Sequence, residues 1–122
     1  MWQKMKFFLS LLITIFYLPI PSQAQESGIT YYLDGNKIKD ICSNMDDRTL
    51  CAYYMIGVVE TIGNLEMLKL TPCIIRLPKG VSGFQLLDLF LKYINNNPEN
   101  KDLPAGSIAF IVLKKNFPCP SK

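Results

Sequence analysis

Hydrophobic residues recur at helical spacing in four stretches of this sequence, and short polar segments separate the stretches. The first stretch follows a turn or cap cluster, Asp34-Gly35-Asn36, and ends near Ser43-Asn44. The second, from Arg48 to about Lys69, contains no proline and is apolar over most of its circumference, so it should be the central helix. The third begins at Ser82 and the fourth at Leu103-Pro104. The pattern predicts an all-α fold, a compact domain of four helices with short connections.

Two glycines, Gly57 and Gly63, interrupt the expected central helix, and each costs about 1 kcal/mol relative to alanine. Close approach of another helix at Gly57 would compensate for this cost, so we expect a helix to pack there. Asp46-Asp47, just before the helix, offers N-cap oxygens and favourable charge. The predicted apolar stripe of the helix consists of Leu50, Tyr54, Val58, Ile62 and Leu65.

The third helix has the clearest start signal, because Ser82 and Gln85 match a capping box. Its end is predicted at the asparagine run before Pro98. In the fourth helix Pro104 suits the first helical position. The segment before the first helix, 29–33, should be extended and should pack Tyr31 and Tyr32 on the helices. The core-facing residues expected in these last two helices are Leu87, Phe90, Leu91, Ile94, Ile108, Ala109, Val112 and Leu113.

Residues 1–24 have the features of an export signal peptide. Lys4 and Lys6 precede an apolar run at 7–20, and Ser22-Gln23-Ala24 places small residues where a cleavage site needs them. The run is shorter than the ~20 residues that span a bilayer. An uncleaved membrane anchor is the alternative, although the prolines at 19 and 21 favour cleavage. No cysteine follows the expected cut, so no lipid anchor is expected there, and residues 25–122 should form a single helical domain.

The sequence has four cysteines, Cys42, Cys51, Cys73 and Cys119, all after the expected cut. An even number of cysteines in an exported domain predicts disulfide bonds. Three pairings are possible and the sequence does not choose between them. We favour Cys42–Cys51, across a short turn between helices, and Cys73–Cys119, which would tie the middle loop to the chain end. A zinc site is the competing use, but the chain has no histidine and no closely spaced cysteine pair, so we expect no metal or cofactor.

The charge balance and the missing residue types argue against nucleic-acid binding and catalysis. The 25–122 part carries 11 basic and 10 acidic side chains, without a basic stripe among aromatics. Without histidine, neither a Ser-His-Asp nor a Cys-His arrangement is possible, and disulfide-bonded cysteines are not nucleophiles. Glu60 and Glu66 would lie about 120° apart around a helix, so we expect them to be solvated rather than an acid–base pair. We expect the protein not to be an enzyme.

Five segments of the chain resemble, in order, the Rap/Tai family of small exported proteins, which includes immunity partners of type VI secretion amidase effectors. The resemblance covers most of residues 35–119 and includes all four cysteines. One departure is visible: the family usually has proline directly after the cysteine of the middle loop, whereas four residues separate Cys73 from Pro78 here. The similar segments are Gly35-Asn36-Lys37-Ile38 through Cys42, Cys51 through Val59, Cys73 with Pro78-Lys79-Gly80-Val81, Lys92-Tyr93-Ile94 through Glu99, and Leu103-Pro104-Ala105 through Cys119.

The resemblance implies a periplasmic protein that binds a peptidoglycan amidase and occludes its Cys-His active-site cleft, as a homodimer. Inhibition of this kind needs a protruding polar loop on a rigid scaffold. The candidate is the polar segment between the third and fourth helices. The alternative is that this segment is only a solvated connector. Its expected partner-binding residues are Asn95, Asn96, Asn97, Glu99, Asn100, Lys101 and Asp102.

The sequence leaves a second class of function open. A small exported helical domain also suits a periplasmic binding or assembly factor of the same fold with no toxin partner. A cysteine amidase encoded beside this protein would favour the immunity interpretation, whereas an isolated gene would favour the assembly factor.

Overall fold

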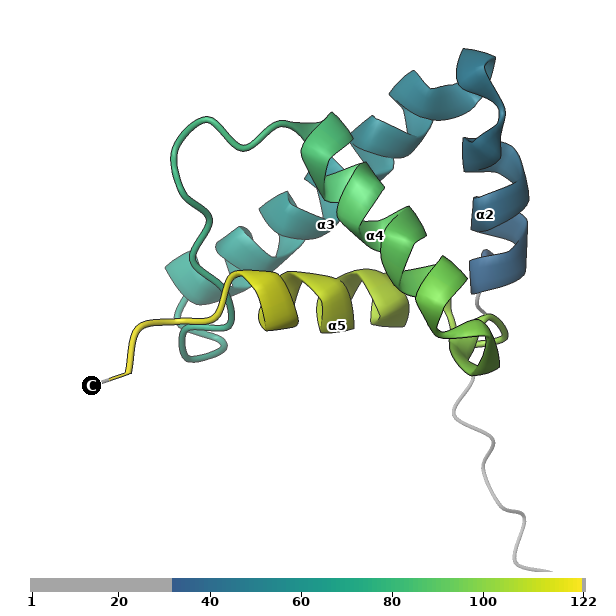
Figure 1. Ribbon diagram of the computed structural model, residues 1–122. Coiled ribbons are helices and arrows are strands. Elements are labelled where there is room, and N and C mark those ends of the chain that lie inside the picture. The colour runs from purple at the N-terminus through teal and green to yellow at the C-terminus, as the bar shows by residue number, and fades with distance from the viewer. Residues whose placement is uncertain (1–31, 122) are drawn as a thin grey trace, which may run out of the picture.

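The computed structural model describes residues 32–121, and there the chain is helical, as predicted (Figure 1). No strand forms in this part of the chain, where only two isolated bridges pair Asp34 with Pro104 and Ile75 with Pro118. The expected signal peptide, residues 1–24, and Tyr31 lie outside the described residues. The helices are α2 (Gly35–Ser43), α3 (Arg48–Met67), α4 (Gly83–Asn96) and α5 (Ala105–Asn116), with 3₁₀ turns at Met45–Asp47 and Pro98–Asn100.

One hydrophobic core lies where the four helices meet. In Figure 1, α4 lies across α3, α5 runs along the bottom of the view and α2 stands at one side. Every helix contributes to the core, and nearly all of the residues expected from α4 and α5 are buried. The largest fully buried side chains are Cys42, Met55, Leu87, Phe90, Ile108, Val112 and Leu113.

Side-chain capping hydrogen bonds fix the starts of two of the four described α-helices, α2 and α4. The Asp34 carboxylate accepts a hydrogen bond of 2.8 Å from the Lys37 amide and begins α2. The capping box of α4 is confirmed, since the Gln85 amide donates to Ser82 Oγ and the Ser82 amide donates to Gln85 Oε1. Pro104 stands at the N-cap of α5, one residue before the predicted place.

The predicted start of α3 at Arg48 is confirmed, but the expected capping hydrogen bond is absent. Asp47 occupies the N-cap position but makes no capping hydrogen bond with its side chain. A 3₁₀ turn precedes α3, and its cap is Asn44, which accepts a hydrogen bond from the Asp46 amide. The unpaired amides therefore lie at the start of that turn, earlier in the chain than the sequence suggested.

The buried side of α3 also differs from the predicted stripe. Ile62 is buried, and Tyr54 and Val58 are partly buried against the core, as expected, but Leu50 is 67% exposed. The core also takes Cys51, Ala52 and Met55. Because α3 is apolar on several sides, its sequence does not determine which side is covered. The packing of α4 against α3 determines it.

The close helix approach occurs at Gly83 of α4 rather than at Gly57. A Cβ at Gly83 would lie 2.8 Å from the Ala52 carbonyl oxygen and 2.9 Å from Ile56 Cδ1. A Cβ at Gly57 would meet nothing within 4 Å. Tyr32 was also expected to pack on the helices, but its side chain is 85% exposed.

Both favoured disulfides are present. Cys42 is bonded to Cys51, with their Cα atoms 5.8 Å apart, and Cys73 to Cys119, with Cα atoms 6.1 Å apart. The first bond links α2 to α3 and the second links the loop after α3 to the segment after α5. None of the described helices combines the length and the apolar character that crossing a bilayer requires.

Candidate partner-binding surface

The predicted partner-binding segment, 95–102, forms the corner between α4 and α5. Asn95 and Asn96 end α4, the 3₁₀ turn follows, and Lys101 and Asp102 lead to α5. The structure brings the seven predicted residues together but divides them into two groups. Asn97 and Asn100 are half-buried, whereas the other five are exposed: Asn95, Asn96, Glu99, Lys101 and Asp102.

The half-buried pair holds the corner to α4. The Asn97 amide and its side-chain Nδ2 both donate to the Tyr93 carbonyl oxygen, at 2.9 and 2.8 Å. Asn100 Nδ2 donates to the Tyr93 hydroxyl at 3.0 Å. These two asparagines use side-chain donors within the chain, so we assign them to the scaffold rather than to a partner contact.

The corner is also fastened to the start of α2. The Gly35 amide donates to the Leu103 carbonyl oxygen and the Asn36 amide to the Lys101 carbonyl oxygen, each at 3.0 Å. Asn36 Nδ2 donates to Asp102 Oδ1 at 2.9 Å. The first amides of a helix have no partner within the helix, and here carbonyl oxygens from this part of the chain accept hydrogen bonds from two of them. A Cβ at Gly35 would lie 2.6 Å from the Lys101 carbonyl oxygen, so this approach needs glycine.

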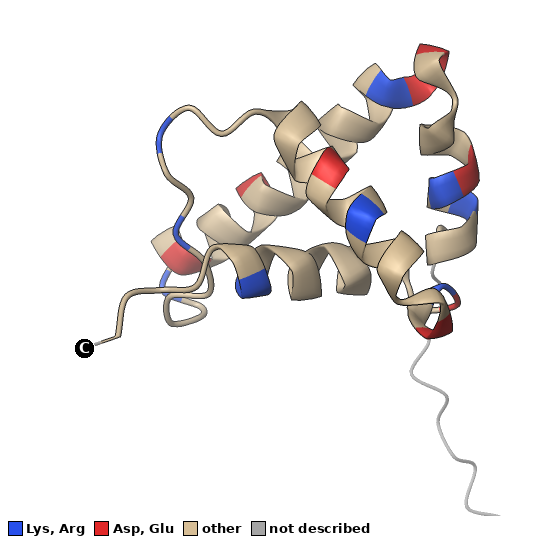
Figure 2. Ribbon diagram, in the orientation of Figure 1, with Lys and Arg blue, Asp and Glu red and all other residues tan. Residues whose placement is uncertain are grey.

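The exposed side of the corner presents both charge signs, as Figure 2 shows near its lower right edge. Within the described residues the ion pairs are Arg48–Asp88 and Arg76–Glu66, and neither involves the corner. Glu99 and Lys101 make no side-chain hydrogen bond there either, so their charges face solvent and are available to a partner.

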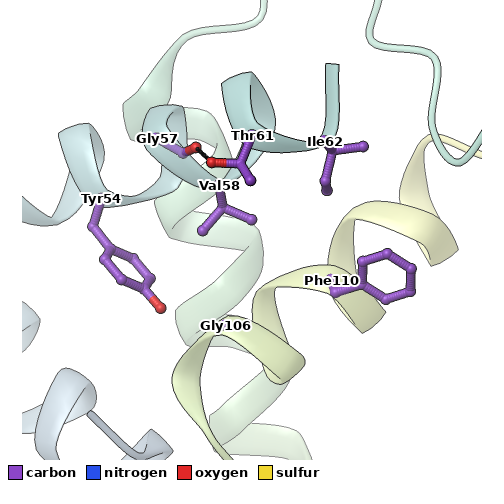
Figure 3. A pocket seen from close by; sticks show the side chains of 7 residues that line it. All are labelled: Tyr54, Gly57, Val58, Thr61, Ile62, Gly106 and Phe110. Atoms are coloured by element: carbon purple, nitrogen blue, oxygen red, sulfur yellow. Dashed lines mark hydrogen bonds between the residues drawn. The ribbon is translucent and has the colours of Figure 1, made fainter. Parts of the chain in front are cut away.

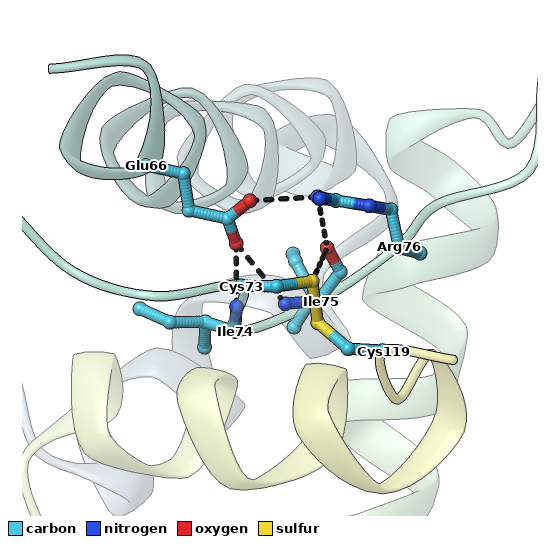
Figure 4. Close-up of polar contacts among 6 residues, drawn as sticks. All are labelled: Glu66, Cys73, Ile74, Ile75, Arg76 and Cys119. Atoms are coloured by element: carbon cyan, nitrogen blue, oxygen red, sulfur yellow. Dashed lines mark hydrogen bonds and ion pairs between the residues drawn. A yellow bond between two sulfur atoms is a disulfide. The ribbon is translucent and has the colours of Figure 1, made fainter. Parts of the chain in front are cut away.

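Glu66 belongs to a second polar cluster and is not the solvated residue we expected (Figure 4). Its Oε1 accepts hydrogen bonds from the Ile74 and Ile75 amides, at 2.6 and 3.3 Å, and its Oε2 lies 2.7 Å from Arg76 Nη1. The Ile74 amide and then the Arg76 guanidinium hold the pKa of Glu66 below its usual value. The chain returns to α3 after a loop, which sequence spacing could not show.

This second cluster offers neither a metal site nor an acid–base pair. A Glu66 oxygen and the sulfurs of Cys73 and Cys119 lie within 4.8 Å of one another. The two sulfurs are bonded to each other, so they are not thiolate ligands. The carboxylate is already engaged by three donors, and its role here is to hold the loop.

The structure also reveals apolar hollows that the sequence analysis missed. The hollow between α3 and α5 measures about 440 Å³ (Figure 3). Burial raises the pKa of Tyr54, one of its walls. A smaller hollow, about 240 Å³, lies between α3 and α4 and includes Tyr53 and Phe84. The larger hollow is lined by Tyr54, Gly57, Val58, Thr61, Ile62, Gly106 and Phe110.

A signal for the larger hollow was present in the sequence. Gly57 and Thr61 lie three and seven residues after Tyr54, so they fall on the same side of the helix as Tyr54. Small or polar residues beside an apolar stripe indicate a side that is not fully packed. The described part of the chain therefore combines a rigid polar corner with an open apolar side of α3, an arrangement suited to contact with other proteins.

Comparison with protein families gives one match. A family model described as Rap1a immunity proteins matches residues 34–119, which contain the four described helices and all four cysteines. Comparisons with curated proteins and with solved structures give no match.

Proposed function

The chain belongs to the Rap1a immunity protein family, and we propose that it inhibits a peptidoglycan amidase effector of type VI secretion by occluding the active-site cleft of that enzyme. This inhibition would protect the cell that makes the protein. The polar corner at 95–102 is the observation that carries this proposal, because it has the form that insertion into a cleft requires.

A corner that enters a cleft must keep its shape and must leave no backbone group unsatisfied. The carbonyl oxygens of Lys101 and Leu103 are already occupied by amides of α2. Asn97 and Asn100 fix the turn from inside. A segment held in this way loses little conformational entropy when it docks, so its exposed side chains contribute more fully to affinity.

The outer side chains suit the polar surroundings of a hydrolytic site. Glu99 and Lys101 carry opposite charges on one turn, and Asn95 and Asn96 add amide donors and acceptors beside them. We propose these four as the partner contacts, with Asp102 in a supporting role because it also accepts from Asn36.

We further propose that the protein is exported and acts in the periplasm, after cleavage of residues 1–24. The two disulfides support this, because such bonds persist in oxidising compartments and not in the cytosol. The resemblance to the Rap/Tai family also implies a homodimer.

The test is inhibition of the amidase encoded beside this protein or captured with it from cell envelope extracts. Glu99→Ala with Lys101→Ala should weaken inhibition by about tenfold or more, the scale of losing two polar contacts at the centre of an interface. Both residues are exposed and outside the scaffold bonds, so the helical signal should not change.

Asp40→Ala with Lys79→Ala is the matched control, since it also removes one acid and one base from the surface. This control should inhibit like the wild type. If the corner variant also inhibits like the wild type, the partner does not contact the corner. If the folded wild-type protein binds no amidase, the assembly-factor interpretation replaces this one.

A further inference from the structure

Basic and acidic side chains are unevenly distributed over the described chain. Residues 67–81 and 114–121, here called the basic end, contain five basic side chains and no acidic one. The remaining described residues contain five basic and nine acidic side chains. In Figure 2 the loop after α3 and the last turn of α5 are blue where they are charged, whereas the red segments lie on the other elements. The bases of the basic end are Lys69, Arg76, Lys79, Lys114 and Lys115.

The two segments of the basic end form one surface, although they lie far apart in the sequence. A disulfide joins Cys73 to Cys119, and the Arg76 amide donates to the Phe117 carbonyl oxygen at 2.9 Å. All five bases are exposed, and within the described residues only Arg76 among them forms an ion pair, with Glu66. The basic end therefore presents positive charge that the described chain does not neutralise.

Three large apolar side chains are exposed at the same end. Met67, Leu68 and Leu70 are 70%, 63% and 67% exposed, and Lys69 stands among them in the sequence. We call residues 67–70 the apolar turn. Exposed apolar side chains that cluster beside charged ones mark an interaction site, whereas single exposed ones are ordinary surface.

The backbone of the apolar turn is bonded within the chain. The Lys69 amide donates to the Glu66 carbonyl oxygen and the Leu70 amide to the Leu65 carbonyl oxygen, each at 3.0 Å. Lys69 has a φ of 58°, the left-handed conformation in which glycine is usual after a helix. Lysine at this position places a positive charge between two exposed leucines. Because the amides of the turn need no water, the turn can enter an apolar medium without stranding these donors.

The start of α3 offers a comparison inside the same molecule. Met45 and Leu50 are also exposed, at 78% and 67%. Asp46 and Asp47 lie between them, so the exposed apolar residues there stand beside negative charges. The apolar turn is therefore distinguished by the bases around it and not by its hydrophobicity alone.

We propose that the basic end docks on the surface of an anionic phospholipid bilayer. The apolar turn would lie in the headgroup region, and the lysines would contact lipid phosphates. Such a surface requires exposed apolar side chains beside bases and no shaped pocket, and this is the combination that the basic end presents. Anionic lipid attracts the bases at this end and repels the acidic side chains elsewhere, so the charge distribution also fixes the orientation of the protein.

Docking in this orientation leaves the corner at 95–102 accessible. The corner precedes α5 and part of the basic end follows it, and the twelve residues of α5 span about 18 Å. Figure 1 shows the corner and the chain end at opposite ends of α5. The proposal goes beyond amidase inhibition and does not depend on it.

Vesicle co-sedimentation tests the docking. The sample is the processed, disulfide-bonded protein recovered from the periplasm, because residues 1–24 contain an apolar run that would itself bind lipid. The protein should bind phosphatidylcholine vesicles in which roughly a third of the lipid is phosphatidylglycerol, and added salt should weaken the binding. Lys114→Gln/Lys115→Gln should lower the partition coefficient about 30-fold, since each base near such a surface contributes about fivefold. Lys37→Gln/Lys92→Gln removes two exposed bases outside the basic end and should change it little.

A second pair of variants tests the apolar contribution. Leu68→Ser/Leu70→Ser should lower the partition coefficient about tenfold or more, because two apolar side chains no longer leave water. Met45→Ser/Leu50→Ser, its matched control, removes two side chains of similar exposure beside the aspartates and should bind like the wild type. All four positions are exposed, so the helical signal should not change in either variant.

Fluorescence tests whether the apolar turn enters the lipid. Trp2 is the only tryptophan of the chain and lies in the expected signal peptide, so the processed protein should contribute no background. Leu68→Trp should shift its emission to the blue when the anionic vesicles are added, because the indole would move from water into the interface. Leu50→Trp, at a position of similar exposure, should not shift. This measurement also decides the matter if a serine variant fails to fold.

Three results would overturn the docking: equal binding of the two lysine double variants, equal binding to vesicles of phosphatidylcholine alone, or no shift for Leu68→Trp. Retention on isolated peptidoglycan without vesicle binding would also overturn it and would assign the basic end to a cell-wall polymer. These experiments contain no amidase, so their failure leaves the role of the corner untouched. The Glu99→Ala/Lys101→Ala variant, in turn, should bind vesicles like the wild type, whether or not it inhibits.

Discussion

At the first end of α3, Cys42 and Cys51 lie inside the hydrophobic core, 0% and 4% exposed, whereas at the second end Cys73 lies on the surface. The first disulfide joins cysteines that are nine residues apart, on two helices that are packed together. The second joins a loop to the segment after α5, across a sequence separation of 46. Packing surrounds one bond and is sparse around the other.

Polar interactions replace packing at the second end of α3. The loop after α3 has backbone amides that no helix satisfies, and the Glu66 carboxylate accepts from two of them. The Arg76 amide donates to the Phe117 carbonyl oxygen at 2.9 Å, next to the bridge between Ile75 and Pro118. Figure 4 shows the Glu66 contacts beside the second disulfide.

Two similar disulfides can therefore stabilise a fold in different ways. At the buried bond, the sulfurs are also core atoms, so their replacement changes packing and polarity. At the exposed bond, the sulfurs chiefly restrict the unfolded chain. Substitutions that separate these terms should therefore behave differently at the two ends.

The largest effect is expected from Cys42→Ser/Cys51→Ser. Loss of the ten-residue loop constraint costs about 2.7 kcal/mol in the chain-entropy model. Two hydroxyls buried without partners add about 1–3 kcal/mol each. The free energy of unfolding, measured in urea, should fall by about 5 kcal/mol or more, close to the whole stability of a small domain. Cys42→Ala/Cys51→Ala should cost less, and equal costs for serine and alanine would contradict the role of burial.

A smaller effect is expected from Cys73→Ser/Cys119→Ser, about 4 kcal/mol from the longer loop. Because Cys73 is exposed and Cys119 half-buried, the alanine version should match the serine version within about 0.5 kcal/mol. Hydrogen exchange should rise in the loop after α3 and in the segment after α5, while α2 and α4 stay protected. A serine version clearly worse than alanine would mean that the second bond is also part of the core.

The smallest effect concerns pH at the second end. The Glu66 pKa is lowered in the folded protein, so Glu66 stabilises the fold above its unfolded value of 4.5. This stability is lost as the pH falls below 4.5 through the folded pKa. Glu66→Gln should weaken the dependence of the unfolding free energy on pH in that range. Glu60→Gln, exposed on the same helix, should keep the wild-type profile. A Glu66→Gln profile identical to the wild type would show that the carboxylate charge is not used.

The sequence alone was sufficient for the features that depend on neighbours within a few residues. Asp34 and Ser82 cap their helices through bonds that span three residues, so pattern and residue type predict them. The all-α class and the buried faces of α4 and α5 followed from helical periodicity. The disulfide pairing is different: the cysteine count allowed three pairings, and the structure confirmed the favoured one.

For the candidate site, the sequence located the corner but did not sort its residues. It placed seven polar residues between two helices: Asn95 and Asn96 are the last residues of α4, and the other five lie between α4 and α5. Which of them face inward depends on Tyr93 and on the start of α2, about 60 residues earlier in the chain. The division into scaffold and exposed contacts therefore required the three-dimensional arrangement.

Only the tertiary structure decided which side of α3 is covered, which glycine is crowded and what Glu66 binds. In the contact between α3 and α4 the crowded glycine is Gly83, whereas Gly57 faces open space. Glu66 meets the amides of a loop that turns back onto α3. Helix formation is governed by contacts three or four residues apart, so sequence patterns record it. Helix crossings are set by packing between distant segments, and α3 is apolar on several sides, so its pattern permitted more than one solution.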